Sequence, residues 1–383
     1  MSAPKITDDQ LKECLLKGMT KKAIADLYGV HERRVFDRAA ILARKGWSPE
    51  HGLRTEYPDG FKMAKTTIQR GPDGQVERTW ERMCEDPEKL QALMQRSMLA
   101  MVEDLPRFKP KPFAAKDVDP NLLAVYPLGD PHIGMMSWGA ETGQDWDLKI
   151  AERYFCKAFD RVVRTTPHCK EALILNLGDF FHADNMEGVT TRSKHSLDVD
   201  GRYAKMISVG VKIMRQMIET ALAVHETVRV INCIGNHDDT GSQFLAVLLM
   251  HVYENEPRVV IDGSPTPFHY LRWGKVLLGA HHGHTCKAPG LPAVMAASRP
   301  EDWGATVYRY WYTGHIHHDT LKEYPGVKVE SFRTMAAADA YATWGGYISG
   351  QDIKAIVLHK QRGEVERHTV HIDHLRDAKG VSV

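Results

Sequence analysis

Residues 122–132 read LLAVYPLGDPH, an apolar run of strand length that ends in a cluster of Gly, Asp and His. Four more apolar or aromatic runs end in similar polar clusters: ALILNLGDFFH (172–182), TVRVINCIGNHD (227–238), KVLLGAHHGH (275–284) and YWYTGHIHH (310–318). The stretches between the runs are long enough for crossover helices, most clearly at residues 150–163 and 202–224. This pattern predicts an α/β fold.

The five polar clusters are expected to meet, because ligands of open α/β sheets bind outside the carboxyl ends of the strands. Three strand-like pieces near the end of the chain are expected to complete a second sheet: VKVESF (327–332), KAIVLH (354–359) and ERHTVHI (366–372). We therefore predict one crevice that collects all five clusters.

The residue types in these clusters suit a pair of divalent cations. Two cations about 3.5–4 Å apart activate water and stabilise charge on the attacking and leaving oxygens of a phosphate ester. Asp179 is the natural bridging carboxylate, and Asp130 with His132, two residues apart, can chelate one ion. Asn236 offers a neutral amide oxygen. The sequence therefore predicts a two-metal phosphoesterase.

The order and spacing of the clusters resemble the calcineurin-like metallophosphoesterases, whose motifs run DxH, GDx, GNHD/E, H and GHxH. The resemblance covers roughly residues 121–320 and implies a four-layered α-β-β-α sandwich. It also implies two ligand sets: Asp130, His132, Asp179 and His317 for one metal, and Asp179, Asn236, His282 and His315 for the other. The expected ions are two Mn²⁺, with iron, zinc or magnesium as alternatives.

Several histidines have implied or open roles. His237 would lie near the leaving oxygen as a general acid or transition-state stabiliser. His281 is the alternative to His282 as a ligand. His284 and His318 are expected either to hydrogen-bond to the metal ligands or to be exposed.

The motif GDFFH resembles the double-strand-break repair nuclease branch of that family, in which the equivalent of His182 supports phosphodiester processing. The alternative is that His182 only starts a helix beside the metals. The phosphoprotein phosphatase branch is disfavoured because its GDxxDRG motif is missing. The resemblance is incomplete, since those nucleases add a DNA-capping region after the last motif and the chain after His317 is short.

The front of the chain predicts three helices, at residues 8–17, 21–28 and 31–44, in a pattern that resembles a helix-turn-helix unit with a turn at Gly29. Residues 17–45 hold eight Lys or Arg and three Asp or Glu, an excess of +5 in a chain of net charge +1. The candidate DNA-binding residues on the third helix are His31, Arg33, Arg34 and Arg38. The alternative is a solvated helical bundle used for protein contacts.

A second candidate DNA contact is the polar stretch TTRSKHSLDVDGR (190–202), through Arg192, Lys194 and His195, although an ordinary surface loop fits equally well. We divide the chain into a helix-turn-helix module (1–50), a hairpin, helix and proline-rich linker (51–120) and a metallophosphoesterase domain (121–383). The hairpin is expected around PDG in TTIQRGPDGQVERTW (66–80), the helix at 87–102 and the linker at 107–120.

Three functions follow as hypotheses. The first is a DNA nuclease, expected to be an exonuclease; the second is a phosphatase or small phosphodiesterase acting on a nucleotide or phosphoprotein; the third is a DNA-binding regulator with a vestigial phosphoesterase domain. The complete ligand set argues against the third, and the front module favours the first. The arrangement, with its extra module in front, resembles proteins of bacterial viruses.

Bulk composition bounds these hypotheses. The chain is 43% hydrophobic, has no apolar run of the roughly 18–20 residues that a membrane span needs, and begins without an apolar signal segment. Its six cysteines are scattered, which predicts reduced thiols in a cytoplasmic protein. The oligomeric state is left open, with a homodimer among the alternatives.

Overall fold

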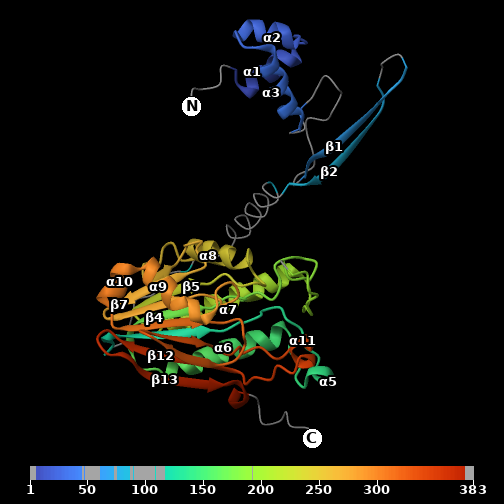
Figure 1. Cartoon of the computed structure of the whole chain (residues 1–383). Coiled ribbons are helices and arrows are strands. Elements are labelled where there is room, and N and C mark those ends of the chain that lie inside the picture. Colours follow the sequence, from blue (N-terminus) through green and yellow to red (C-terminus); the bar gives the residue numbers. More distant parts are fainter. Residues whose placement is uncertain are drawn as a thin grey trace. The chain divides into compact units, whose positions relative to one another are not determined.

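The computed structural model describes residues 6–44, 47, 61–72, 76–86, 89, 108, 117–191 and 193–375. The chain divides into two compact units, Met1–Met101 and Val102–Val383, which are described separately (Figure 1). The helix predicted at residues 87–102 and most of the predicted linker at 107–120 lie outside the described residues. The last two residues of that linker, Asp119 and Pro120, already belong to a strand.

The first unit contains three helices and a hairpin. The helices are α1 (Asp8–Leu16), α2 (Lys21–Tyr28) and α3 (Glu32–Arg44), and the antiparallel strands are β1 (Phe61–Arg70) and β2 (Val76–Glu85). Thr7 and Gln10 form a capping box at α1, and the Thr20 hydroxyl caps α2. Gly29 ends α2 in the left-handed conformation with φ +59°. These helices and strands agree with the predicted ones within a few residues.

The second unit holds two sheets. The six-stranded sheet has the order β13-β12-β3-β4-β5-β6, with β3 (Asp119–Leu128), β4 (Cys169–Asn176), β5 (Thr227–Asn232), β6 (Val259–Ile261), β12 (Asp352–His359) and β13 (Gly363–His371). The five-stranded sheet has the order β10-β11-β9-β8-β7, with β7 (His269–Trp273), β8 (Val276–Ala280), β9 (Tyr308–Thr313), β10 (Thr320–Tyr324) and β11 (Val327–Ser331). Strands β3 to β6 are parallel to one another, and β9 is parallel to β8 and β11.

The helices of this unit are α5 (Gly139–Thr142), α6 (Leu148–Thr165), α7 (Tyr203–Leu222), α8 (Gly241–Val252), α9 (Leu291–Ser298), α10 (Pro300–Ala305) and α11 (Ala340–Trp344), with short 3-10 turns at Ala288–Gly290 and Ile372–Leu375. None of the helices in the described part of the chain is long and apolar enough to cross a membrane. All six cysteines are free thiols.

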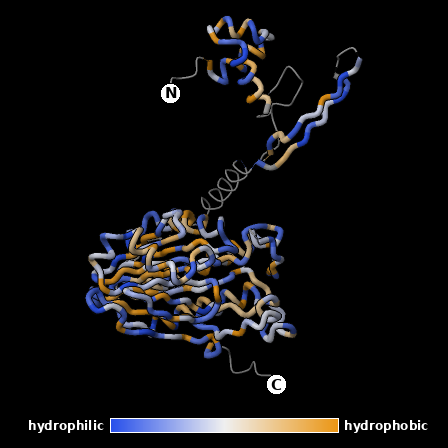
Figure 2. Tube along the Cα trace, in the orientation of Figure 1, coloured by the Kyte–Doolittle hydropathy of each residue, from blue (hydrophilic) through white to orange (hydrophobic). Residues whose placement is uncertain are grey.

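The two sheets pack face to face between two helical layers. Val125 and Leu173 of the first sheet share a core with Leu278 and Tyr312 of the second. The other face of the first sheet packs against α6, α7 and α8, and the other face of the second packs against α9 and α10. Apolar residues gather along the inner strands (Figure 2). The four-layered α-β-β-α arrangement implied by the resemblance is therefore present.

The expectation for the last strands was wrong in part. Strand β11 joins the second sheet, but β12 and β13 extend the first sheet, where β12 pairs antiparallel with β3. Residues of β12 are buried on both faces: Ala355 and Val357 lie in the helix-side core, and Ile356 and Leu358 in the core between the sheets. A strand that is apolar on both faces is stable inside a two-sided sheet, which explains its position beside β3.

Candidate metal centre

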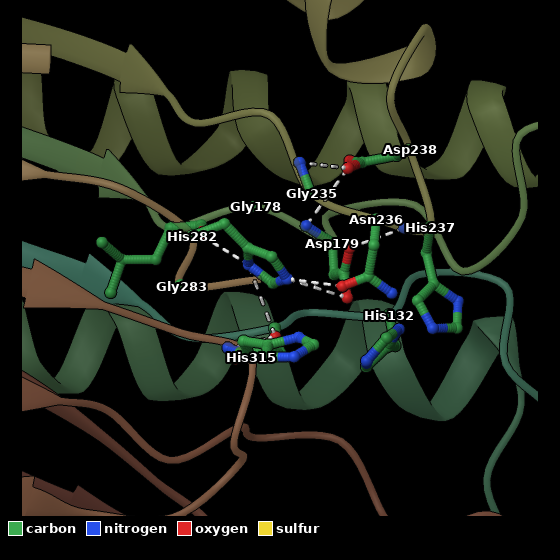
Figure 3. A network of polar contacts seen from close by, with 12 residues as sticks. His132, Gly178, Asp179, Gly235, Asn236, His237, Asp238, His282, Gly283 and His315 are labelled. Carbon is green, nitrogen blue, oxygen red and sulfur yellow. Dashed lines mark hydrogen bonds and ion pairs between the residues drawn. The ribbon is translucent and has the colours of Figure 1, made fainter. Parts of the chain in front are cut away.

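All five predicted clusters meet at one edge of the second unit. Three follow β3, β4 and β5 of the first sheet, and two follow β8 and β9 of the second. Because the motif strands run parallel within each sheet, their carboxyl ends lie at a common edge. The crevice therefore lies across two facing sheets, as the expected four-layered sandwich implies. Figure 3 shows the side chains converging.

The first group of side chains is Asp130, His132 and His317, whose candidate ligand atoms lie within 4.8 Å of one another. His132 Nε2 is 3.1 Å from His317 Nε2, and His317 Nε2 is 3.5 Å from Asp130 Oδ1. Asp130 and His132 are buried. A carboxylate and two imidazoles at these separations form a donor set that a divalent transition metal can use.

The second group is Asp179, His282 and His315, with Asn236 beside it. His282 Nδ1 donates to the Leu177 carbonyl at 2.8 Å, so Nε2 of the neutral ring carries a lone pair. That Nε2 lies 3.2 Å from Asp179 Oδ2 and 3.0 Å from Asn236 Oδ1. Three acceptor atoms that face one another inside the protein repel unless a cation lies between them, and this geometry fits a metal ion.

The pKa shifts of Asp179, His132 and His282 agree with a cation site at these two groups. Burial alone would raise the pKa of Asp179, but the imidazoles of His282, His237 and His132 hold it well below its usual range. Burial together with the neighbouring histidines keeps the pKa of His132 well below its usual range. Burial also opposes protonation of His282, but the carboxylates of Asp179 and Asp130 raise its pKa to about 10. Without metal, a proton would therefore occupy the place of the cation at His282.

The backbone is strained at the predicted ligands. Among the described residues, positive φ occurs at seven non-glycine positions, and five are predicted ligands: Asp130 (43°), His132 (44°), Asp179 (50°), His315 (73°) and His317 (55°). Such conformations cost about 1–3 kcal/mol each and persist where surrounding contacts enforce them. Here the Asp130 carboxylate accepts the His315 N–H at 2.8 Å, and Asp179 Oδ1 accepts the His237 N–H at 2.8 Å. The ligand loops thus hold one another in place.

Asp238 is a functional residue for which sequence reasoning gave no role. Its buried carboxylate accepts backbone N–H groups from Gly235, Asp179, Phe180 and Phe181 at 2.9–3.2 Å. Figure 3 shows the contacts with Gly235 and Asp179. These contacts fasten the loop after β4 to the loop after β5. Its position as the last residue of the GNHD motif was the one sign in the sequence that Asp238 matters, because no metal contact was predicted for it.

Two glycines give the ligands the space they need. A Cβ at Gly235 would lie 2.1 Å from Asp179 Oδ1, and a Cβ at Gly178 would lie 2.7 Å from His282 Nδ1.

Thr334 is a further residue that the sequence did not predict, and its hydroxyl donates to the Asp130 carbonyl at 2.6 Å. It comes from the segment after β11, so a sixth segment supports the first ligand loop.

The two predicted catalytic histidines lie beside the first group. His237 Nδ1 donates to the His182 carbonyl at 2.9 Å, which leaves Nε2 of its partly exposed ring available. His182 Nδ1 lies 3.2 Å from His132 Nδ1, and its Nε2 is buried without a hydrogen-bond partner. Burial and the charge of His237 lower the pKa of His182 to about 3. Together, His132, His182 and His237 form a third histidine group that the sequence did not predict.

The structure distinguishes His281 from His282, the two alternative ligands of the fourth motif. His281 Nδ1 accepts the Gly283 N–H at 2.9 Å, so its Nε2 donates to the Thr285 hydroxyl at 3.0 Å, and its ring stacks on Phe268. Both nitrogens of His281 therefore bond to the protein, whereas His282 faces Asp179. His318 is exposed and donates to the Ile316 carbonyl, and His284 lies against the His282 ring.

The candidate DNA-binding residues divide between the units. In the first unit, Arg33 and Arg34 are exposed on α3, His31 Nδ1 accepts the Arg33 N–H at 3.2 Å, and Arg38 pairs with Asp8 at 2.6 Å. In the second unit, Lys194 and His195 are exposed in the loop after the second motif. Arg192 lies outside the described residues. Their role in binding DNA stays a prediction.

No protein-family model and no curated protein matches this sequence. Among solved structures, the chain is similar to a predicted phosphoesterase from Streptococcus pneumoniae TIGR4, with 8% identity over 66% of this chain and 91% of that one, and a TM-score of 0.29. It is also similar to Vps29 from Entamoeba histolytica complexed with zinc, with 12% identity over 65% and 99% and a TM-score of 0.27. A third similar structure is vacuolar protein sorting 29 from Cryptosporidium parvum, with 12% identity over 65% of this chain and 97% of that one, and a TM-score of 0.30. All three TM-scores are below 0.5, and all three identities are below 25%.

Proposed function

We propose that the second unit is a metal-dependent phosphoesterase that uses two divalent cations. The observation that carries this proposal is the pair of adjacent groups, Asp130/His132/His317 and Asp179/His282/His315, at the carboxyl ends of facing strands. Mixed imidazole, carboxylate and amide donors suit manganese, iron or zinc better than magnesium or calcium, which prefer oxygen ligands alone. Mn²⁺ remains the first ion to test.

Each group would hold one cation. Asp130, His132 and His317 would bind the first, and Asn236, His282 and His315 the second, with Asp179 as the proposed bridge. When bound, such a pair supplies a water of lowered pKa and charge stabilisation for a phosphate ester. The chain itself supplies a neutral His132 imidazole, an ionised Asp179 and strained loops held by hydrogen bonds between them.

His237 would handle the proton at the leaving oxygen. The His182 carbonyl fixes the ring through Nδ1–H, so Nε2 is the atom that faces outward. A protonated ring held in this way can donate from Nε2 to a leaving oxygen and is stabilised by the carbonyl. The buried, neutral His182 would act mainly by presenting that carbonyl and by packing against His132.

We further propose that the substrate is a DNA phosphodiester and that the protein is a nuclease, with exonuclease action as the first form to test. The exposed Arg33 and Arg34 on α3 and the excess of basic residues at 17–45 support a DNA-binding role for the first unit. The alternatives are a phosphatase or small phosphodiesterase acting on a nucleotide or phosphoprotein, and a DNA-binding regulator without activity. The complete set of ligand side chains argues against the regulator.

One experiment separates these functions. The purified full-length protein with Mn²⁺ is given end-labelled linear duplex, single strand, closed circular DNA, a chromogenic phosphodiester and a chromogenic phosphomonoester. An exonuclease cleaves the linear DNA and the diester and leaves the closed circle intact. Hydrolysis of the monoester alone would favour a phosphatase. DNA binding without hydrolysis of any substrate would favour the regulator.

A further inference from the structure

Four aromatic side chains are exposed on two neighbouring segments of the second unit: Trp138 (64%), Tyr341 (74%), Trp344 (81%) and Tyr347 (63%). We call these four residues the aromatic rim. Among the described residues of this unit, they are the only aromatic side chains of Phe, Tyr or Trp that are largely exposed. Large rings are normally buried at least in part, and a cluster of exposed ones marks a surface that contacts something else.

Hydrogen bonds define the backbone that carries three of the four rim residues. Asp339 Oδ1 caps α11 by accepting the Ala342 N–H at 2.8 Å, and beyond the helix Tyr347 N–H donates back to the Ala342 carbonyl at 2.9 Å. This return places the Tyr347 ring against Tyr341, with centroids 6.2 Å apart and planes at 26°. The spacing of three residues puts Trp344 on the same helix face as Tyr341. The Tyr341 and Tyr347 rings therefore support each other, and Trp344 lies beside Tyr341 on the helix.

The rim is fastened to the loop that carries the first metal ligands. Thr334 bonds to the Asp130 carbonyl, and the Ser137 hydroxyl donates to the Ala338 carbonyl at 2.7 Å. Helix α5, which follows Trp138, packs against α11 (Figure 1). Trp138 is six residues beyond His132. The two residues therefore lie no more than about 20 Å apart, which is the length of the fully extended chain between them. Trp138, with α11 packed beside its helix, therefore lies within reach of a short single strand that passes through the metal centre.

The chemistry around the rim resembles a site for a single strand. Residues 340–350 contain no charged side chain. On the same metal loop, Met136 N–H donates to the Asp198 carbonyl, and this contact anchors a second loop that carries the exposed cationic or titratable side chains Lys194 and His195. Proteins that bind single strands combine cations for the phosphates with aromatic rings for the bases.

Resting on the proposed function, we propose that the aromatic rim stacks unpaired nucleobases of the strand whose phosphodiester lies at the metal centre. The rim would make single-stranded DNA and frayed ends the preferred substrates, without strong sequence preference, because every base has a flat face. Hydrogen bonds join the Asp130 loop to the segment before α11, so a base stacked on the rim would position its backbone for hydrolysis.

The test uses the full-length protein with Mn²⁺ and three substrates: a short oligothymidylate, an abasic strand of the same length, and a chromogenic phosphodiester. In Trp344→Ala, KM for the oligothymidylate should rise about tenfold while kcat changes little, because loss of one stacking ring typically weakens binding by that order. The oligothymidylate-to-diester ratio of kcat/KM should fall accordingly. Trp344→Phe should restore most of the ratio. The abasic strand should be a poor substrate for the unaltered protein and insensitive to Trp344→Ala.

The matched control is Val307→Ala, which removes an exposed apolar side chain directly before β9, at the opposite end of that strand from His315. It should leave the ratio unchanged. The inference is overturned if Trp344→Ala and Tyr341→Ala leave the oligothymidylate KM unchanged, or if the abasic strand is cleaved as well as the normal one. It is also overturned if the substitutions only abolish self-association in sedimentation experiments. If the unaltered protein hydrolyses the diester but no DNA, the proposed function itself has failed.

Discussion

The metal centre collects side chains from segments as far apart as Asp130 and His317, whereas the three N-terminal helices pack within residues 6–44. In the metal centre the candidate ligands are mostly buried, several have strained backbones, and neighbouring loops hold them by hydrogen bonds. On α3 the candidate residues Arg33 and Arg34 are exposed, and the helix packs on a small apolar core that it shares with α1 and α2.

This difference teaches where substitutions should matter most. A change in the metal centre removes a group that no other residue can replace and leaves buried partners unsatisfied. A change on the exposed face of α3 removes one of several charges in water, each with a modest effect. Substitutions in the metal centre should therefore have larger effects than substitutions on the exposed face of α3.

The largest effect is expected for Asp179→Asn, which should abolish hydrolysis of every substrate. The carboxylate is the proposed bridge between the cations, and a loss of several kcal/mol corresponds to a rate reduction of about 10³-fold or more. Initial rates with Mn²⁺ and metal content by elemental analysis check this. Asp160→Asn, on the outer helix α6, is the control. Two bound metals with unchanged activity in Asp179→Asn would contradict the site.

His237→Ala should retain metal but slow turnover by roughly 10²–10⁴-fold, the usual contribution of a positioned acid–base group. Metal content and kcat measured on the same preparation separate the two roles. Loss of metal from this variant would show that His237 is a ligand, and the role assigned to it would then be wrong.

Asp238→Asn should mainly reduce stability. An amide at this position offers one acceptor oxygen where the carboxylate now serves four N–H groups, and the NH₂ group would face donors. We expect a loss of about 3 kcal/mol, or about 6–12 °C in melting temperature for a unit of this size. Thermal unfolding measures the shift. An unchanged melting temperature would mean that the two loops are held together by other contacts.

The smallest effect is expected for the double variant Arg33→Ala with Arg34→Ala. Affinity for duplex DNA should fall about tenfold, and the slope of log K against log salt should decrease by about two, since each phosphate contact releases about one counterion. The ratio of DNA cleavage to chromogenic diester hydrolysis should fall in parallel. Titrations at several salt concentrations provide the measurement. Equal affinity at every salt concentration would remove α3 from the DNA-binding surface and weaken the nuclease proposal.

The sequence predicted local features of the fold well because their causes are local. The helices predicted at residues 8–17, 21–28 and 31–44 are present with ends that differ by one residue at most, and the predicted turn at Gly29 is a left-handed residue. Apolar runs such as residues 122–128 form strands. Pairing between distant strands is different, because it depends on which faces are covered. The placement of β12 beside β3 followed from burial on both faces and could not be read from its own residues.

For the candidate site, the sequence alone determined the residue types, their order and the loops that carry them, because each cluster directly follows its strand. Only the tertiary structure decided which strands make up each of the two facing sheets and that His282 rather than His281 faces Asp179. It also revealed Asp238 as the fastening of two loops and brought the aromatic rim to the metal loop. These features depend on distances between segments that are far apart in the chain, and such distances are set by packing of the whole unit.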